Sequence, residues 1–267
     1  MTASSFSYPL TYGYCLVGKV MRAGSESEHL LNATVFSFSP HSTSVTAKAS
    51  SVIVVPPGID PYRAIFLPSI ETAISLIHDA EVIPGESVGV VGQGLIGLLV
   101  TAILKYQRFD VTAFEFIDER QALSAFLGAD VVLSPATTEF DDNLDVSIEV
   151  SGVGAGLQTA IDRTGDGGRI VIGSLYPKDK VALQLGMDFH RSKKRLVVSQ
   201  VSTLPSKLQQ RWTKERRFDL AWSLIRQLPL ERLIGEVMGL DEAQEAFELL
   251  SRGERSVVAF DLRRPVK

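Results

Sequence analysis

Three closely spaced glycines form the part of the chain whose spacing best predicts chemistry. An apolar run, Val88–Val91, precedes them, and an apolar stretch with the length of a helix, Leu95–Tyr106, follows. In such a setting Gly92 allows a tight turn, Gly94 leaves the backbone open to a phosphate, and Gly97 lets the helix approach the strand. The amides and the dipole of a helix N-terminus also favour a bound phosphate. The residues expected to bind a dinucleotide pyrophosphate are Gly92, Gln93, Gly94, Leu95, Ile96 and Gly97.

An acidic residue at the end of the next apolar run supports the same interpretation. Glu115 follows Val111–Phe114 and lies 18 residues after Gly97. Its carboxylate can accept hydrogen bonds from the adenosine ribose. It would repel a 2′-phosphate in contact with it by up to about 4 kcal/mol at an intermediate dielectric constant. Screening by solvent would reduce this repulsion. We therefore expect NAD(H) to be preferred over NADP(H). The alternative is that the glycines only turn the chain and that Glu115 is a solvated strand end.

The central region alternates between short apolar runs and helix-length stretches. Strands are expected at Ser87–Val91, Val111–Glu115, Asp130–Leu133, Asp145–Val150, Arg169–Gly173 and Arg195–Ser199. Helices are expected at Leu95–Tyr106, Glu119–Leu127 and Ala155–Arg163. This alternation predicts an α/β fold with a parallel, doubly wound sheet. Ligands bind such sheets at the carboxyl ends of the strands.

The two ends of the chain have different patterns. Short β-segments are expected at Tyr14–Val20, Thr34–Phe38 and Ser44–Ala47, before a boundary at Pro56–Pro61. The last third predicts a polar helix with apolar residues Leu220, Leu224 and Leu228, a helix at Asp241–Leu250 with Asp241 as N-cap and Gly253 as its stop, and a strand at Ser256–Phe260.

The composition excludes several classes of protein. The chain has 267 residues, is 45% hydrophobic and carries a formal net charge of -4, so nothing favours nucleic acid or an anionic membrane as a partner. No apolar run is long enough to span a membrane, and the first residues do not resemble a secretory signal. A single cysteine, Cys15, excludes an internal disulfide and fits a reducing compartment. We expect a cytoplasmic protein. Its basic clusters, 190–195 and 211–217, are interpreted as solvated faces.

Several further stretches occur in the order and spacing of a known family. They are Gly13–Val20 (similar to G-H-E-x-x-G-x-V), Leu67–Ala73, Leu127–Asp130, Asp145–Gly152, Gly167–Val171, and Asp188–Arg191 with Val198–Gln200. Together with the glycine motif they resemble the medium-chain dehydrogenase/reductase superfamily, which includes the zinc alcohol dehydrogenases and quinone reductases. The resemblance implies a Rossmann sheet, a smaller GroES-like β-domain and hydride transfer with a nicotinamide cofactor. It also implies a homodimer, in which the edge strand of the cofactor domain could pair.

The chain departs from the pattern of that superfamily in two ways. It begins only a short way before the G-H-E-like segment, so the β-domain is expected to be truncated or the chain to be a fragment. Tyr14 stands where a ligand histidine would be, and Pro68 stands where another zinc ligand would be. The four-cysteine structural lobe is also missing. Because zinc needs three or four N, S or O ligands, we expect no metal site and a zinc-lacking branch of the superfamily.

The resemblance also implies positions for further cofactor-binding residues. Thr72 would lie behind the nicotinamide ring, although a helix residue bonded to its own backbone is an equal alternative. Ser151 and Gly152 would border the nicotinamide ribose, and the backbone of Gly173, Ser174 and Leu175 could meet the carboxamide. Arg120 completes the set of residues expected near the cofactor.

Hydride transfer without zinc needs another group to stabilise or remove charge at the substrate oxygen. Tyr14 is the first candidate, although a half-buried barrel tyrosine is the more common case. Glu71 could act as a base, against the alternative of a solvated or capping glutamate. His41 is the remaining catalytic candidate, since His190 better suits an ordering role. Cys15 is expected only to pack.

These observations predict three regions and one reaction class. The regions are a partial GroES-like β-domain at 1–64, a Rossmann dinucleotide-binding domain at 65–204, and C-terminal helices with a strand returning to the β-domain at 205–267. The expected function is zinc-independent hydride transfer between NAD(H) and an alcohol, carbonyl or activated double-bond substrate of small size. The alternative is a non-catalytic NAD(H)-binding protein, acting as a sensor or a partner subunit.

Overall fold

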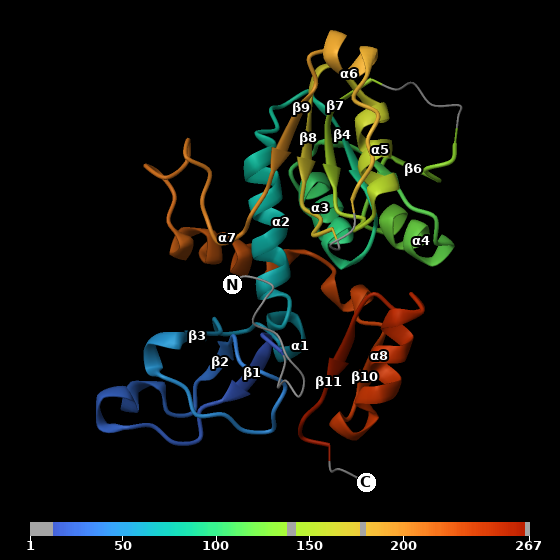
Figure 1. Cartoon of the computed structure of the whole chain (residues 1–267). Helices are drawn as coiled ribbons and strands as arrows, with labels where there is room; N and C mark the ends of the chain where they lie inside the picture. The colour runs from blue at the N-terminus through green and yellow to red at the C-terminus, as the bar shows by residue number, and fades with distance from the viewer. Residues whose placement is uncertain (1–12, 138–142, 177–179, 265–267) are drawn as a thin grey trace. The chain divides into compact units, whose positions relative to one another are not determined.

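A six-stranded sheet forms the centre of the larger part of the molecule (Figure 1). The computed structural model describes residues 13–137, 143–176 and 180–264. The sheet contains β4 (Ser87–Val91), β5 (Asp110–Phe114), β6 (Val131–Leu133), β7 (Leu144–Glu149), β8 (Thr164–Ile172) and β9 (Arg195–Val198). All its strand pairs are parallel, and the strand order is β6-β5-β4-β7-β8-β9. The order reverses between β4 and β7, as in a doubly wound Rossmann sheet. The predicted fold class is therefore confirmed.

Helices cover this sheet on both faces (Figure 1). They include α2 (Leu67–Ala80), α3 (Leu95–Tyr106), α4 (Asp118–Phe126) and α5 (Gly154–Arg163). The short α6 (Met187–Arg191) lies beyond one end of the strands, and α7 (Lys214–Gln227) is joined to α2 by the Arg217–Glu71 ion pair. The predicted bounds of α3 match the structure, and every residue from Gly97 to Leu104 is buried. A helix buried all round needs no polar face, which explains its almost wholly apolar sequence.

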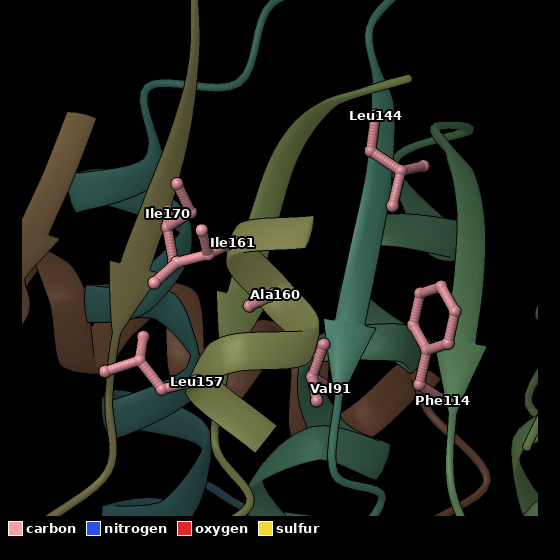
Figure 2. Close-up of a cluster of buried hydrophobic side chains, with 7 residues drawn as sticks. All are labelled: Val91, Phe114, Leu144, Leu157, Ala160, Ile161 and Ile170. Carbon is pink, nitrogen blue, oxygen red and sulfur yellow. The ribbon is translucent and has the colours of Figure 1, made fainter. Parts of the chain in front are cut away.

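A buried apolar cluster joins α5 to the sheet. It consists of Val91, Phe114, Leu144, Leu157, Ala160, Ile161 and Ile170. In Figure 2 the three α5 members of the cluster lie against the side chains that come from the strands. Removing one leucine from such a core costs about 2–5 kcal/mol, so the cluster fixes the start of α5 relative to the strand ends.

The chain divides into two units. The second comprises Ser69–Leu233 and contains the six-stranded sheet. The first combines the chain up to Pro68 with the segment from Ile234 onward. The boundary drawn from sequence at residue 204 therefore differs from the structure, because α7 belongs to the sheet unit. Its buried face includes Leu224 and Leu228, as the apolar spacing predicted.

The first unit contains a small antiparallel sheet of β1 (Leu16–Lys19), β2 (Thr34–Ser37) and β3 (Val52–Val54). The prediction of a strand at Ser44–Ala47 is wrong, because the strand that pairs with Val35–Ser37 of β2 is β3, later in the chain. Residues 44–47 are all exposed, so no core favours an extended strand there. Short helical turns, η2 (Ser25–Leu30), η3 (Ala49–Ser51) and α1 (Pro61–Ala64), complete this part. Asp60 caps α1 by accepting a bond from the Tyr62 amide.

The C-terminal segment forms its own two-stranded sheet, β10 (Glu236–Met238) with β11 (Val258–Phe260). Between them lie η5 (Leu240–Glu242) and α8 (Ala243–Ser251), and η4 (Leu230–Leu233) ends the sheet unit. Asp241 is not the N-cap: η5 begins after Gly239, whose amide donates to Glu242 Oε2 at 2.6 Å. Gly253 has a φ of 73° and ends α8, as expected. No helix in the described part of the chain is long and apolar enough to span a membrane.

Candidate cofactor site

The glycine-rich turn has the geometry that its sequence predicted. Gly92 has a φ of 92°, and a Cβ there would lie 2.6 Å from the Ser151 Cα. A Cβ at Gly97 would collide with the carbonyl oxygen of Gly92. Gly94 differs from both, because no atom lies within 4 Å of where its Cβ would be. Two of the glycines thus close the turn on itself, and the third leaves open space beside the backbone.

Helix α3 presents its amino end to this open space. Gly94 is the N-cap residue, and the amide of Leu98 makes the first helical bond to the Gly94 carbonyl oxygen at 2.9 Å. By helix geometry, the amides of Leu95, Ile96 and Gly97 have no acceptor within the helix. Open space beside free amides fits a phosphate group, which these N–H groups and the helix dipole would bind.

The Gln93 side chain does not face the space expected to hold the pyrophosphate. Its side chain is fully buried, and its amide nitrogen donates to the Val90 carbonyl oxygen. Its amide oxygen accepts bonds from the hydroxyls of Thr101 and Ser124, both at 3.1 Å. Gln93 therefore faces away from the open side of the turn and ties the turn to α3 and α4.

Glu115 is buried at the carboxyl end of β5 and is bonded mainly to the backbone. Its Oε2 accepts a bond from the Gln93 amide at 2.8 Å, and its Oε1 accepts bonds from the amides of Phe116 and Ile117. A carboxylate has about four acceptor positions, so one remains beside these three bonds. Arg120 lies near, with a guanidinium nitrogen 3.9 Å from Glu115 Oε2 and a buried Nε that has no partner.

The ends of β7 and β8 bring the other expected cofactor residues together. The Gly152 amide donates to the Ser174 hydroxyl at 2.8 Å. Ser151 packs on the glycine-rich turn through Gly92. Leu175, next in the chain, is 94% exposed. The two strand ends and the glycine-rich turn therefore form one continuous edge of the sheet.

Thr72 belongs to the same region. A Cβ at Gly173 would lie 2.6 Å from a methyl group of Leu76, so this part of α2 packs on the end of β8. Thr72 is one helical turn before Leu76 and lies on the same face of α2. Its neighbour Glu71 instead points into the core, where it forms a buried ion pair with Arg217 at 2.7 Å. The contact of Leu76 with Gly173 is consistent with the position expected for Thr72, whereas Glu71 is directed into the core.

Sequence reasoning missed two residues at this edge, Glu149 and Tyr176. Glu149 is 0% exposed, and the Tyr176 hydroxyl donates to its carboxylate. Burial, together with this carboxylate, raises the pKa of Tyr176 well above its usual value. Glu149 lies within the expected strand Asp145–Val150, and a charged residue in a buried strand was a signal that could have identified it.

Tyr14 and His41 both lie in the first unit, on neighbouring segments. A Cβ at Gly13 would lie 2.7 Å from the His41 backbone nitrogen, so the residue before Tyr14 packs directly on His41. Tyr14 is 53% exposed. The His41 ring packs on the edge of Phe260, and burial lowers its pKa, so it is neutral at pH 7.

The donor groups of the described residues do not match a zinc site. No group of three His, Cys, Asp or Glu residues in the ranges 13–137, 143–176 and 180–264 is arranged to hold a metal ion. Cys15 donates to the Ile65 carbonyl oxygen at 2.9 Å, and burial raises its pKa to about 12. Since the thiolate is the form that binds metal, Cys15 is a poor zinc ligand.

Comparison with known proteins agrees with this fold. Residues 96–217 match the family model described as zinc-binding dehydrogenase. The D-guloside 3-dehydrogenase of Escherichia coli K12 is 26% identical over 251 residues, which cover 88% of this chain and 72% of that enzyme.

Two solved structures share the fold. An alcohol dehydrogenase of E. coli CFT073 complexed with NADH has a TM-score of 0.77 at 15% identity, over 96% of this chain and 85% of that one. A protein of Sinorhizobium meliloti 1021 that is described as a zinc-binding dehydrogenase and is bound to NADP has a TM-score of 0.75 at 18% identity, over 90% of this chain and 80% of that one. The order of the strands, the glycine-rich turn and these likenesses agree with the resemblance of the chain to the medium-chain dehydrogenase/reductase superfamily.

Proposed function

We propose that the protein is an NAD(H)-preferring oxidoreductase that interconverts an alcohol and a carbonyl compound without a catalytic zinc ion. One observation carries the cofactor part of this proposal. The space beside Gly94, the free amides of α3 and the Glu115 carboxylate lie on one edge of the sheet. The space and the free amides suit a pyrophosphate, and the carboxylate can accept a hydrogen bond from the adenosine ribose.

The preference for NAD(H) follows from the charge of Glu115. Its remaining acceptor position suits a ribose hydroxyl, which is a donor. A 2′-phosphate at the same place would meet a carboxylate that is held by three backbone amides and cannot turn away. Even about 1.4 kcal/mol of repulsion gives tenfold discrimination. Arg120 partly offsets this charge, so we expect a preference rather than an absolute exclusion.

The chemistry is divided between the cofactor and the protein. When bound, the nicotinamide supplies or accepts the hydride. The protein must hold a proton at the substrate oxygen, and we assign this task to the hydroxyl of Tyr14. His41, neutral at pH 7 and packed beside the Tyr14 segment, is the group that would take the proton onward. Glu71 is excluded from this role, because a carboxylate in a buried ion pair is a poor base.

Independence from zinc rests on the types of residue present. Tyr14 and Pro68 stand where ligands would be expected, and the Cys15 thiol is protonated at neutral pH. These groups cannot replace the thiolate, imidazole and carboxylate ligands that zinc uses. No step in the proposed reaction therefore passes through a metal ion.

The substrate class is proposed from the named relative. D-guloside 3-dehydrogenase acts, by its name, on a sugar derivative at carbon 3. We propose a secondary hydroxyl of a polyhydroxylated compound as the group oxidised. The test is a panel of sugars, glycosides and polyols with NAD⁺ and with NADP⁺, after dialysis against a chelator, followed at the nicotinamide absorbance.

We expect turnover by the wild type to be unchanged after treatment with the chelator. In Tyr14→Phe, turnover should fall about 100-fold. Tyr106→Phe, which removes from the half-exposed end of α3 a hydroxyl that bonds to Gln227, is the matched control and should keep full activity. Loss of activity on chelation with recovery on adding zinc would contradict the zinc-independent mechanism. Cofactor binding with no turnover of any compound would instead favour the non-catalytic alternative.

A further inference from the structure

The carboxylate of Glu149 is the most deeply buried charged group at the cofactor edge of the sheet. It ends β7, one of the two central strands, and no part of the residue is exposed. Its Oε1 accepts bonds from the amide and the hydroxyl of Ser151, at 2.7 and 2.5 Å. Its Oε2 accepts the bond from the Tyr176 hydroxyl. All three donors are neutral, and among the described residues no cation is bonded to Glu149.

A buried carboxylate without a cation is costly unless its acceptors are filled. Glu149 therefore constrains the residues that donate to it, since losing any donor leaves part of the carboxylate unsatisfied. An apolar residue could end β7 without this cost. What Glu149 provides is a fixed position for Ser151 and Tyr176.

Ser151 is held tightly at this position. A Cβ at Gly92 would lie 2.6 Å from its Cα, and a Cβ at Gly156 would collide with its hydroxyl oxygen. The same hydroxyl accepts a bond from the Val153 amide at 3.2 Å, which connects it to the start of α5. Ser151 thus fits between the glycine-rich turn and α5, with the Glu149 carboxylate behind it.

Tyr176 is held by the same carboxylate from the end of β8. Ser174, two residues earlier, accepts the bond from the Gly152 amide, so the ends of β7 and β8 are tied together twice. Gly152 and Tyr176 also line a shared cavity of about 340 Å³ with Val153, Gly154 and Val181. Tyr176, which Glu149 holds, therefore borders an open space, and Gly152, the residue after Ser151, borders the same space.

The adenosine side of the site depends on other residues. The turn from Gly92 to Gly97 is fixed by Gln93, which bonds to α3 and α4, and by Glu115 at the end of β5. None of these residues bonds to Glu149. Apart from the contact of Ser151 with Gly92, the two halves of the site thus have separate supports, one on each side of β4.

We propose that Glu149 is the positioning residue of the nicotinamide half of the cofactor site. By holding Ser151 and Tyr176 together, it sets the affinity for the nicotinamide riboside portion and leaves the affinity for the adenosine portion unchanged. This inference rests on the proposed binding of NAD(H), and it assigns to one buried residue a role that a general loss of stability would not reproduce.

The test compares two probes on purified, folded variants: NADH for the whole site and ADP for the adenosine half. The variants are Glu149→Gln, which removes the charge at nearly constant shape, and Tyr176→Phe, which removes one hydroxyl from a half-buried side chain. Tyr106→Phe is the matched control for the loss of a hydroxyl, and Glu115→Gln is the control for the adenosine half. Circular dichroism verifies that each variant is folded.

Glu149→Gln and Tyr176→Phe should each weaken NADH binding by about tenfold or more and change ADP binding by less than about twofold. Glu115→Gln should weaken both probes, and Tyr106→Phe should weaken neither. Wild-type affinity for NADH in both variants, or equal loss of NADH and ADP, would overturn the assignment while the proposed function stands. If the wild type binds neither probe, the proposed function fails, and the role of Glu149 fails with it. Should Glu149→Gln not fold, the Tyr176→Phe comparison alone decides.

Discussion

Gly94 differs from the other two glycines of the turn because a Cβ there would meet no atom within 4 Å, and this gives a specific prediction. Gly94→Asp places a carboxylate in the open space without a clash and without backbone strain, since the residue is in an extended conformation. Repulsion of the pyrophosphate should then weaken NADH binding by about 100-fold or more, with an unchanged melting temperature. Titration of NADH fluorescence measures this effect.

Gly94→Ala is the matched control and should bind NADH within a few-fold of the wild type, because a methyl group fills little of that space. Gly97→Ala is the opposite case and should unfold or strongly destabilise the turn, since its Cβ collides with Gly92. Normal NADH binding by Gly94→Asp would show that the phosphate does not lie beside this residue.

At the level of single residues, the sequence predicted backbone geometry better than side-chain direction. The turn at Gly92 and the close approach at Gly97 could be predicted because only glycine tolerates either. The inward direction of Gln93 could not, because its partners Thr101 and Ser124 come from two different helices. The partner of Glu71, Arg217, is also distant in the chain, so no local pattern indicated that this carboxylate is buried.

Helices α2 and α7 are joined by a buried ion pair, and breaking it should be costly. Arg217 is 1% exposed and donates to Glu71, to the Val201 carbonyl oxygen and, at 3.5 Å, to the Ser75 hydroxyl. Arg217→Ala leaves the Glu71 carboxylate buried without a cation, and we expect the free energy of unfolding to fall by about 3–5 kcal/mol. Urea unfolding followed by tryptophan fluorescence measures this, because Trp212 and Trp222 both lie in the sheet unit.

The double variant Glu71→Met with Arg217→Leu should recover most of that loss, since two apolar side chains replace the pair. A loss below about 1 kcal/mol in the single variant would mean that the pair is solvated rather than buried.

The His78 side chain on α2 makes the stability of the sheet unit depend on pH. Burial, with the charges of Arg217 and Arg216, lowers its pKa from 6.5 to about 4, and its ring packs on the edge of Trp212. In the unfolded chain His78 becomes protonated below about pH 6.5, whereas in the folded chain it becomes protonated only near pH 4. The contribution of neutral His78 to the free energy of unfolding is therefore fully present above pH 6.5, and it is lost as the pH falls through about 4.

The measurement is the melting temperature between pH 8 and pH 4, in the wild type and in His78→Phe. Phenylalanine keeps the contact with Trp212 but does not titrate, so the variant should lose less stability between pH 6.5 and 4. Parallel pH profiles in the two proteins would show that His78 does not contribute.

Elements were predictable where burial and pattern agree. The strands and helices of the Rossmann sheet combine apolar runs with the spacing of a βαβ unit, and their positions match within a few residues. The small antiparallel sheet was harder, because residues 44–47 and β3 are both short and β-branched. Pairing with β2 decided between them, and pairing depends on tertiary structure rather than on propensity.

At the scale of the whole molecule, β9 lies at one edge of the six-stranded sheet and presents apolar side chains to solvent. Val198 is 73% exposed, and Leu196 is also exposed. Exposed apolar edges of this kind favour pairing with a second strand, and we propose that two copies of the chain associate through β9. Sedimentation should show a dimer in the wild type and a monomer in Val198→Lys. A monomeric wild type, or a dimer that survives the substitution, would contradict this proposal.

The division into two units also explains which parts of the account are easiest to test. The expected cofactor residues all belong to the sheet unit, whereas Tyr14 and His41 belong to the first unit. The cofactor proposal therefore rests on residues of one unit, and the proposal for the proton donor rests on residues of the other. A failure of the catalytic proposal would leave the cofactor proposal intact.

The most direct test of the central claim is a titration of the purified chain with NADH and, separately, with NADPH, followed by nicotinamide fluorescence. We expect saturable binding of NADH that is about tenfold or more tighter than that of NADPH, because Glu115 repels the additional phosphate. Equal affinities, or tighter binding of NADPH, would contradict the role given to Glu115. Absence of binding by either would contradict the cofactor site itself.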